Sequence, residues 1–581
     1  MKISYRLLIL PLLLLTLVGC KDDVTAPTFD IQKGYSISLP YDINHGETLT
    51  FSASDDWKIE NDDQRLSFSK TSGKAGTNNI VVKANAYNCT NEDANYSFSI
   101  TSSNEAGTNT VDVKVTHEPV FRIDKLSYEA DAMGDTLCIS LKTKADVFRS
   151  LLIYFNSSSD FAQMAGYEYP AKEQSEIAEG KMMCIKPTTR VSGSIEDEHE
   201  FLIIITPNYS SKVLQGYFRL GIGSEGQMMS EEMVVVQPPA NIYHSEDMET
   251  EDSKVTQLQK HTIGKGVPFV IMGDGFVDKD IANGTFHEAA NKALDALFSL
   301  HPMKALKDYF DVYEVTAVSY DKYFSNYTNT AFSSKFTPNS SIISGDNEKV
   351  VKYAEKAIGE KRIEDAVLIV LVNDGRYAGT CYMYTDYNKS DIPNGMSIAY
   401  VPLTDSTEPG MEFPGILCHE AVGHGFGKLA DEYVNEDYGM MEPEDKLMYQ
   451  ELQKYGLYRN MTWNSDVTKS YWANLASDSR YDFEHLGCYE GAAGYENDVY
   501  RPTMTSIMND NINGFNVVGR QMIYKRCMKI AYGDTWKYNN ADFVAFDLEE
   551  AKASASSKRK APVKRSANFR PLGKPRVIMR K

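Results

Sequence analysis

The residues best suited to chemistry lie together in the second half of the chain, in the run His419-Glu420-Ala421-Val422-Gly423-His424. Imidazole nitrogens are favoured ligands of Zn²⁺, and a catalytic zinc site needs three protein ligands plus an open position for water. A glutamate beside the first histidine can take a proton as that water attacks a peptide carbonyl. The run therefore predicts a zinc site with His419 and His424 as ligands and Glu420 as catalytic base. The alternative is two histidines that share an exposed helix by chance.

The spacing of the two histidines is one residue longer than in the common HExxH motif. Residues four apart on an α-helix lie about 40° from each other, whereas residues five apart lie about 140° from each other. A π-bulge absorbs one extra residue and would bring His419 and His424 back to one face. Gly423 lacks a Cβ and could ease that distortion. The dipeptidyl peptidase III family uses a similarly stretched motif.

The third zinc ligand is expected a few residues after His424. Ala430 cannot bind a metal, but Asp431 and Glu432 follow it directly. We predict Asp431 as the third ligand, with Glu432 as the alternative. The carboxylate that does not bind zinc would orient a histidine or stabilise the loop.

Several strings resemble the IgA-peptidase family of bacterial zinc metallopeptidases over about residues 240–545. They are the strings Gly427-Lys428-Leu429-Ala430-Asp431-Glu432-Tyr433, Met272-Gly273-Asp274-Gly275-Phe276, Tyr489-Glu490-Gly491-Ala492, Tyr500-Arg501-Pro502 and Ser506-Ile507-Met508. The resemblance implies a metzincin-like zincin fold, with His419 and His424 on zinc and Glu420 as base. The extra residue between the histidines departs from the family's familiar pattern.

Two further features of a metzincin-like site can be sought in the sequence. The string Thr505–Asp510 resembles the Met-turn beneath the metal, which would make Met508 a packing floor; an ordinary core methionine is the alternative. Where some metzincins have an oxyanion-binding tyrosine, this chain has Asp510, so Tyr433, Tyr500 and Arg501 are the candidate substitutes. The segment Ser397–Val401 is predicted as an edge strand that binds substrate as an added antiparallel strand.

The N-terminus predicts export and anchoring. A basic start and a short apolar run make residues 1–19 a lipoprotein signal peptide. Leu17-Val18-Gly19-Cys20 resembles a bacterial lipobox, which implies lipidation of Cys20. Lys21-Asp22-Asp23 resembles an export signal for the cell surface, so we predict a surface-exposed outer-membrane lipoprotein. A periplasm-facing protein and an ordinary signal peptide remain the alternatives.

The rest of the chain predicts several domains, since 581 residues exceed one hydrophobic core. After a linker over residues 20–32, alternating apolar segments predict an all-β sandwich over residues 33–117. That region resembles the BACON domain, which implies glycan or mucin contact; a spacer is the alternative. Residues 118–245 predict a second β-rich domain, and residues 246–550 an α/β catalytic domain. Residues 551–581 predict a basic, disordered tail.

The net charge and the cysteine positions indicate less about function than the motifs above. A formal net charge of -20 disfavours binding to nucleic acid. Cys138 and Cys184 fall in one predicted β domain and could pair, although free thiols are the alternative.

The sequence thus predicts a secreted, surface-anchored zinc endopeptidase acting on extracellular proteins or glycoproteins. Two alternatives remain open. One is a mucin- or glycan-binding surface protein built on an inactive peptidase fold. The other is an exopeptidase, which the stretched histidine motif also allows.

Overall fold

The computed structural model describes residues 24–31, 35–143, 152–155, 183–186, 197–222, 228–325, 328–337, 340–435, 439–557, 566 and 569–580. The predicted signal peptide and Cys20 lie outside the described residues. Among those that are described, no helix is both long and apolar enough to cross a membrane.

The first β domain contains two sheets that share one apolar core. One sheet has the order β1-β3-β7-β5 and the other the order β2-β9-β8-β4-β6. Side chains from both sheets, such as Leu49 and Phe98, lie in the same buried cluster. The strands are β1 (Phe29–Asp30), β2 (Ser36–Leu39), β3 (Glu47–Ala53), β4 (Trp57–Glu60), β5 (Leu66–Phe68), β6 (Ser72–Gly73), β7 (Gly76–Ala84), β8 (Ala94–Asn104) and β9 (Gly107–His117). Because β1 pairs with β3, the first sheet already begins within the predicted linker.

The second β domain also has two sheets, with the orders β10-β12-β15-β14 and β11-β18-β16-β13. The strands are β10 (Arg122–Ile123), β11 (Ser127–Glu129), β12 (Asp135–Thr143), β13 (Leu152–Phe155), β14 (Met183–Lys186), β15 (Asp197–Ile205), β16 (Leu214–Ile222), β17 (Met228–Met229) and β18 (Met233–Gln237). Cys138 and Cys184 both lie opposite Leu202, on the two strands that flank β15. Two strand spacings, about 9.6 Å, separate their backbones, which is too far for a disulfide.

The C-terminal domain is built on one mixed seven-stranded sheet with the order β19-β21-β20-β24-β26-β25-β29. Its strands are β19 (Val255–Gln259), β20 (Val267–Asp274), β21 (Phe310–Val315), β24 (Val367–Val372), β25 (Thr380–Asp386), β26 (Ser397–Pro402) and β29 (Arg576–Arg580). Strands β21, β20, β24 and β26 are parallel, as expected where helices connect them. Two small hairpins complete the strands, β22 (Lys335–Phe336) with β23 (Ile343–Ser344) and β27 (Tyr489–Ala492) with β28 (Tyr495–Arg501).

Helices cover both faces of this sheet, so its central strands are buried on both sides. Every residue of β24 is buried, as is typical of an all-apolar run in a parallel sheet. One face packs on α4 and the helix bearing the histidines, and the other on α6. The helices are α3 (Asp278–Ala282), α4 (Thr285–Leu297), α5 (Met303–Leu306), η1 (Lys307–Tyr309), α6 (Asn347–Ile358), η2 (Glu360–Asp365), α7 (Phe413–Leu417), η3 (Cys418–Phe426), α8 (Pro443–Gln453), η4 (Val467–Lys469), α9 (Ala473–Ala476), η5 (Ser479–Glu484), α10 (Ile507–Asp510), α11 (Val517–Tyr532), η6 (Gly533–Thr535) and α12 (Asn540–Ser557).

Two expectations about the sheet were wrong. The segment Ser397–Val401 is not an edge strand, because β26 lies between β24 and β25. The end of the chain is not wholly irregular either, since Arg576–Arg580 forms β29 against β25. Val577 and Met579 pack on one cluster of the domain and Ile578 on another, so both sides of this short strand are used.

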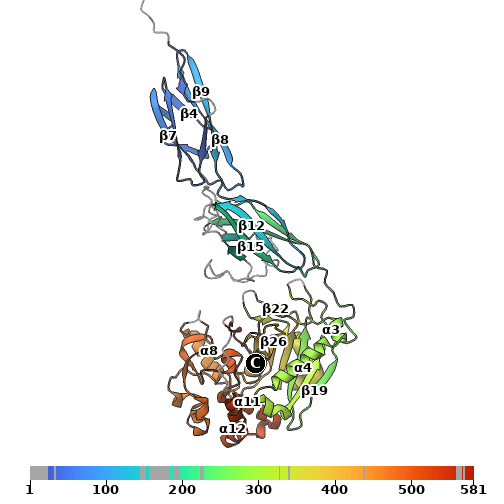
Figure 1. Ribbon diagram of the computed structural model, residues 1–581. Coiled ribbons are helices and arrows are strands. Elements are labelled where there is room, and N and C mark those ends of the chain that lie inside the picture. The colour runs from blue at the N-terminus through green and yellow to red at the C-terminus, as the bar shows by residue number, and fades with distance from the viewer. Residues whose placement is uncertain are drawn as a thin grey trace, which may run out of the picture.

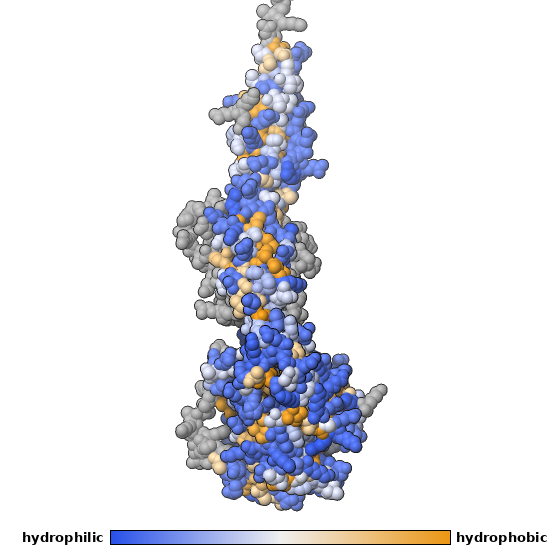
Figure 2. All heavy atoms as spheres, turned by 90° about the vertical axis from the view of Figure 1, so that its right-hand side faces the viewer, coloured by the Kyte–Doolittle hydropathy of each residue, from blue (hydrophilic) through white to orange (hydrophobic). Residues whose placement is uncertain are grey.

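The two β domains lie in line ahead of the C-terminal domain, and the C-terminus lies within that domain (Figure 1). From the side shown in Figure 2, hydrophilic side chains cover most of the C-terminal domain and apolar atoms form small scattered groups.

Candidate metal centre

A π-helix brings the two histidines together. Helix α7 continues directly into η3, a π-helix whose nine residues are all buried. The amide of Gly427 donates to the carbonyl of Val422, five residues back, at 2.7 Å. This wider turn absorbs the extra residue, so the rings of His419 and His424 lie 4.6 Å apart between centroids. The predicted distortion of the helix is therefore present, and it is longer than a single bulge.

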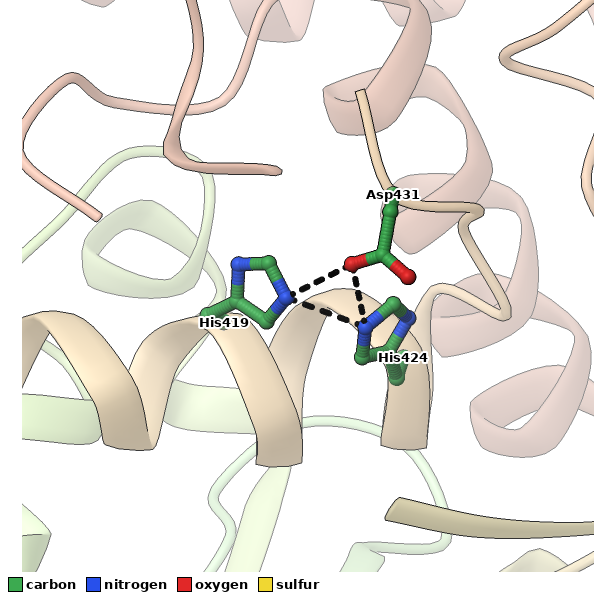
Figure 3. A group of neighbouring side chains, drawn as sticks. All are labelled: His419, His424 and Asp431. Atoms are coloured by element: carbon green, nitrogen blue, oxygen red, sulfur yellow. Dashed lines mark hydrogen bonds and ion pairs between the residues drawn. The ribbon is translucent and has the colours of Figure 1, made fainter. Parts of the chain in front are cut away.

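Asp431 reaches the same point from the loop that follows the helix. The Nε2 atoms of His419 and His424 lie 3.0 Å apart, and Asp431 Oδ1 lies 3.1 Å from each of them. Figure 3 shows the three side chains pointing toward one another. All three are buried. The structure thus places Asp431, and not Glu432, beside the two histidines.

The other ring nitrogens decide what the Nε2 atoms can do. His419 Nδ1 lies 3.0 Å from the carbonyl oxygen of Ile507, and His424 Nδ1 lies 2.8 Å from that of Leu429. A carbonyl only accepts hydrogen bonds, so each Nδ1 carries a proton and donates it. In the neutral histidine tautomer this leaves each Nε2 with a lone pair.

With both imidazoles neutral, three electron-pair donors converge on one point. Such a group is repulsive unless a cation, either a proton or a metal ion, lies at its centre. Ligands bound to zinc at 2.0–2.2 Å in tetrahedral geometry lie about 3.3–3.5 Å apart, close to the separations found here. The donor set of two imidazoles and one carboxylate suits zinc chemically, and the group could hold a metal ion.

Glu420 lies beside this group in an unusual state. Its side chain is fully buried, and neither carboxylate oxygen has a hydrogen-bond partner among the described residues. Burial raises the pKa of Glu420 to about 8; the charge of His419 lowers it and the charge of Asp431 raises it. A Cβ on Gly379 would lie 2.9 Å from Glu420 Oε1, so this glycine leaves space at the carboxylate. An unpartnered buried carboxylate is costly, which is typical of a group that meets a ligand during function.

Glu432 points away from the metal group and holds the loop. Its carboxylate accepts hydrogen bonds from Asn460 at 2.9 Å, from Ser506 at 2.5 Å and from Asn516 at 3.0 Å. Burial raises the pKa of Glu432, and these three hydrogen bonds oppose the rise. Asp431 differs: burial would raise its pKa too, but the contacts with His424 and His419 hold that pKa below its usual range. Two neighbouring carboxylates thus have separate tasks.

Met508 lies against the π-helix. A Cβ on Gly423 would overlap the sulfur of Met508, so the glycine allows η3 and α10 to pack closely with Met508 in this position. Its φ is not in the left-handed region, so a positive φ is not the reason for glycine here. Met508 is buried, and its carbonyl accepts the Glu432 amide at 2.8 Å. Met508 thus packs on η3 at Gly423, and its role as a floor beneath a metal stays a prediction.

Of the three proposed substitutes for an oxyanion donor, Tyr433 lies at the site. Its ring stacks on His419 at 6.3 Å between centroids, and its hydroxyl donates to the carbonyl of Leu572 at 2.5 Å. Arg501 instead donates to carbonyls of its own hairpin, at Glu490 and Gly491. Tyr500 pairs with Thr462 in an isolated bridge. Asn460 and Asn516 also belong to the site, but no local pattern predicts them, because they lie 28 and 84 residues from Glu432 in the chain.

Fold and site together define an α/β domain that presents a buried His-His-Asp group, able to hold a metal ion, beside an unpartnered glutamate. This is the arrangement of a hydrolase site.

Over residues 257–481 the chain matches the model of the family described as IgA Peptidase M64. The resemblance to the IgA-peptidase family predicted from the sequence is confirmed over these residues, and the match supports a peptidase. The resemblance of the first β domain to the BACON domain is not confirmed. No curated protein matches the chain.

Solved structures also match parts of the chain, with low scores. Titin domains Z1Z2 in complex with telethonin are 12% identical, covering 37% of this chain and 98% of that chain at a TM-score of 0.15. An endo-fucoidan hydrolase of glycoside hydrolase family 107 is 11% identical, covering 37% of this chain and 28% of that chain at a TM-score of 0.15. These matches carry no argument about the fold.

Proposed function

We propose that this chain is a zinc-dependent endopeptidase with His419, His424 and Asp431 as zinc ligands and Glu420 as general base. One observation carries the proposal: Nε2 of His419, Nε2 of His424 and Oδ1 of Asp431 lie 3.0–3.1 Å from one another, while each Nδ1 faces a carbonyl oxygen. The peptidase family match of the same domain supports it.

The residues around the site divide the work. A zinc ion bound there supplies Lewis acidity, which makes a water molecule acidic enough to attack near neutral pH. Glu420 takes the proton from that water and passes it to the leaving amine. The carbonyl oxygens of Ile507 and Leu429 hold the two imidazoles in the tautomer that leaves Nε2 free. Glu432 fixes the loop on which Asp431 stands.

The proposed enzyme is a lipid-anchored protein of the cell surface. Lipidation at Cys20 anchors the protein to the outer membrane and faces it toward the cell exterior. Two sandwich domains then carry a metzincin-like zincin domain, and the first, BACON-like domain serves as a spacer or contacts glycans. Extracellular proteins or glycoproteins are the substrate class that fits such a location.

The test is cleavage profiling of the purified protein on a proteome-derived peptide library, with zinc content measured in parallel. We expect internal cleavage by the wild type and by Glu288→Ala, which removes an exposed carboxylate of α4. Glu420→Ala should retain zinc and lose activity by about 10²–10⁴-fold, the usual contribution of a general base. Equal cleavage by Glu420→Ala would remove Glu420 from the mechanism.

The same experiment separates the alternatives. Cleavage restricted to peptides with free termini would indicate an exopeptidase. A protein that binds no zinc and cleaves nothing would favour the glycan-binding alternative.

A further inference from the structure

The last residues of the chain occupy the outer edge of the catalytic sheet. Strand β29 pairs in parallel with β25, from Tyr382 opposite Arg576 to Asp386 opposite Arg580. Without β29, the edge of β25 would offer free backbone groups to another extended chain. The edge that a peptide could join is thus already filled by a segment of this protein.

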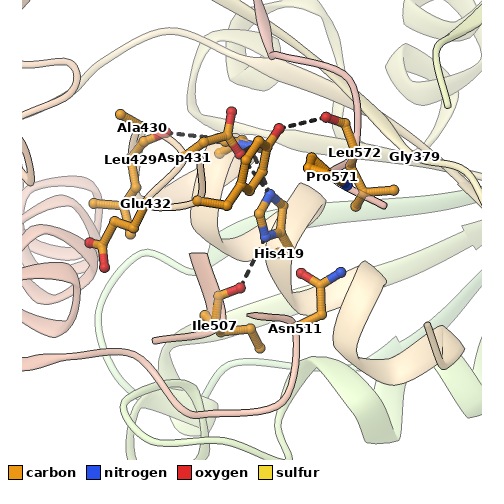
Figure 4. Close-up of polar contacts among 12 residues, drawn as sticks. Gly379, His419, Leu429, Ala430, Asp431, Glu432, Ile507, Asn511, Pro571 and Leu572 are labelled. Carbon is orange, nitrogen blue, oxygen red and sulfur yellow. Dashed lines mark hydrogen bonds and ion pairs between the residues drawn. The ribbon is translucent and has the colours of Figure 1, made fainter. Parts of the chain in front are cut away.

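The residues before β29 pass the metal centre. Three successive carbonyls, those of Arg570, Pro571 and Leu572, accept hydrogen bonds from the hydroxyls of Tyr377, Ser341 and Tyr433 at 2.8, 3.4 and 2.5 Å. The Tyr433 ring in turn stacks on His419. Figure 4 shows Pro571 and Leu572 near His419. An extended peptide therefore already lies beside the metal group, held by its backbone.

Charge and packing also bind this segment. Phe569–Arg580 contains four Lys or Arg and no acidic residue, in a chain of net charge -20. Lys574 Nζ lies 3.9 Å from the centroid of the Tyr495 ring, and the charges of Asp431 and Asp445 act on it favourably. Arg580 forms an ion pair with Glu364 at 2.8 Å. Leu572 is buried, although it belongs to no helix or strand.

We propose that Phe569–Arg580 is a resident occupant of the cleft that binds an extended polypeptide substrate, and that it holds the enzyme latent. The inference rests on the proposed function. The β25 edge and the hydroxyls of Tyr377, Ser341 and Tyr433 bind the backbone of whichever peptide is present. Because these contacts are to the backbone, they select extended polypeptide and not a particular side chain. Substrate enters only when the C-terminal segment has left.

The first test compares the full chain with a form that ends at Ser557. We expect truncation to raise kcat/KM on a peptide substrate at least tenfold. A synthetic peptide of residues 566–581 added to the truncated enzyme should raise KM without changing kcat, as expected for competition. A truncated protein that is folded but no more active than the full chain would overturn the proposal.

A point variant displaces the segment within the full chain. A Cβ on Gly573 would overlap Ile342, so Gly573→Leu should push the segment out and raise activity toward that of the truncated form. Gly439→Leu is the matched control, because a Cβ on Gly439 meets nothing within 4 Å. Equal activity of both variants and the wild type would count against occupancy of the cleft.

Two readouts do not depend on activity. Amide hydrogen exchange of Tyr382–Asp386 should be faster in the truncated form and in Gly573→Leu, while exchange in β24 stays unchanged. Labelled peptide 566–581 should bind zinc-loaded, truncated Glu420→Ala protein in an anisotropy titration. Unchanged exchange and absence of binding would overturn the occupancy. If neither form cleaves any peptide, the proposed function fails, and these two readouts still decide whether the segment occupies the cleft.

Discussion

The first β domain and the C-terminal domain bury very different side chains. The core between the two sheets of the first domain consists of alternating apolar residues, such as Leu49 and Phe51 of β3. The C-terminal domain instead buries three carboxylates. Glu420 lies in η3, and Asp431 and Glu432 lie in the loop that follows it. Apolar burial is non-directional, whereas buried carboxylates need partners in defined places. The first kind of core supplies stability, and the second fixes positions.

The buried polar groups of the C-terminal domain go beyond the metal centre. Lys428 is fully buried and donates to the carbonyl of Met396 at 2.9 Å and to the hydroxyl of Ser397. Arg520 pairs with Asp547 at 2.8 Å. Each removal of charge from water costs free energy that the pairing only partly returns. Apolar burial around β24 stabilises the folded domain and offsets the free-energy cost of burying these polar side chains.

The largest effect on activity is expected from substitution of Asp431, and comparison with its neighbour Glu432 tests their separate roles. Loss of an outer partner of a metal ligand costs about 10–100-fold in affinity or activity, so loss of a ligand should cost more. We expect Asp431→Ala to lose more than about 100-fold in kcat/KM together with its zinc. Glu432→Gln should keep its zinc and lose about 10–100-fold. The zinc content of both purified variants tests this prediction. If Asp431→Ala retained zinc and Glu432→Gln lost it, Glu432 and not Asp431 would be the zinc ligand.

A smaller effect is expected where apolar packing positions the polar site. Gly423→Ala forces a methyl group against the Met508 sulfur, and such overpacking costs about 1–3 kcal/mol. The histidines should shift as well, and a misplacement of about 1 Å can lower activity about 10²-fold. Thermal unfolding and kcat/KM measure the two losses.

The double variant Gly423→Ala with Met508→Ala tests the cause of that loss. Shortening Met508 makes space for the new methyl, so the double variant should recover part of the loss seen for Gly423→Ala. Strictly additive losses would mean that the two residues are not coupled through this contact.

The smallest effect on activity is expected in the first β domain. Leu49 is 0% exposed, and Leu→Ala in such a position costs about 2–5 kcal/mol. Leu49→Ala should therefore speed amide exchange in β3 and its partner β7 while kcat/KM on soluble peptides stays unchanged. A parallel fall in activity would show that the two regions are not independent.

Much of this arrangement could be predicted from sequence because it rests on local patterns. Alternation predicted the strands of the first domain, and the all-apolar run Val367–Val372 is typical of the buried strand that it forms. The spacing of His419 and His424 predicted a widened helix turn, which η3 provides. These signals are carried by residues close together in the chain.

The rest depended on contacts between distant segments. Nothing near Glu432 indicates that Asn516, 84 residues away, would bind its carboxylate and leave Asp431 for the metal group. The tail was predicted to be disordered because of its basic composition. It nevertheless contains the apolar run Val577-Ile578-Met579, which forms the centre of β29. The prediction that Ser397–Val401 is an edge strand failed for the same reason. No local pattern shows that β25 pairs with the outer side of this strand.

The widened turn also sets the phase of the core around it. One residue in an α-helix corresponds to a rotation of about 100°, and the wider turns of η3 take up this rotation, so the segments on either side keep their orientation toward the core. Ile416 and Leu417 before the turn and Phe426 after it are all fully buried. The effect of the inserted residue is thus confined to η3, because the wider turns keep the apolar residues before and after it in the core. This explains how a motif with irregular histidine spacing is compatible with an ordinary core.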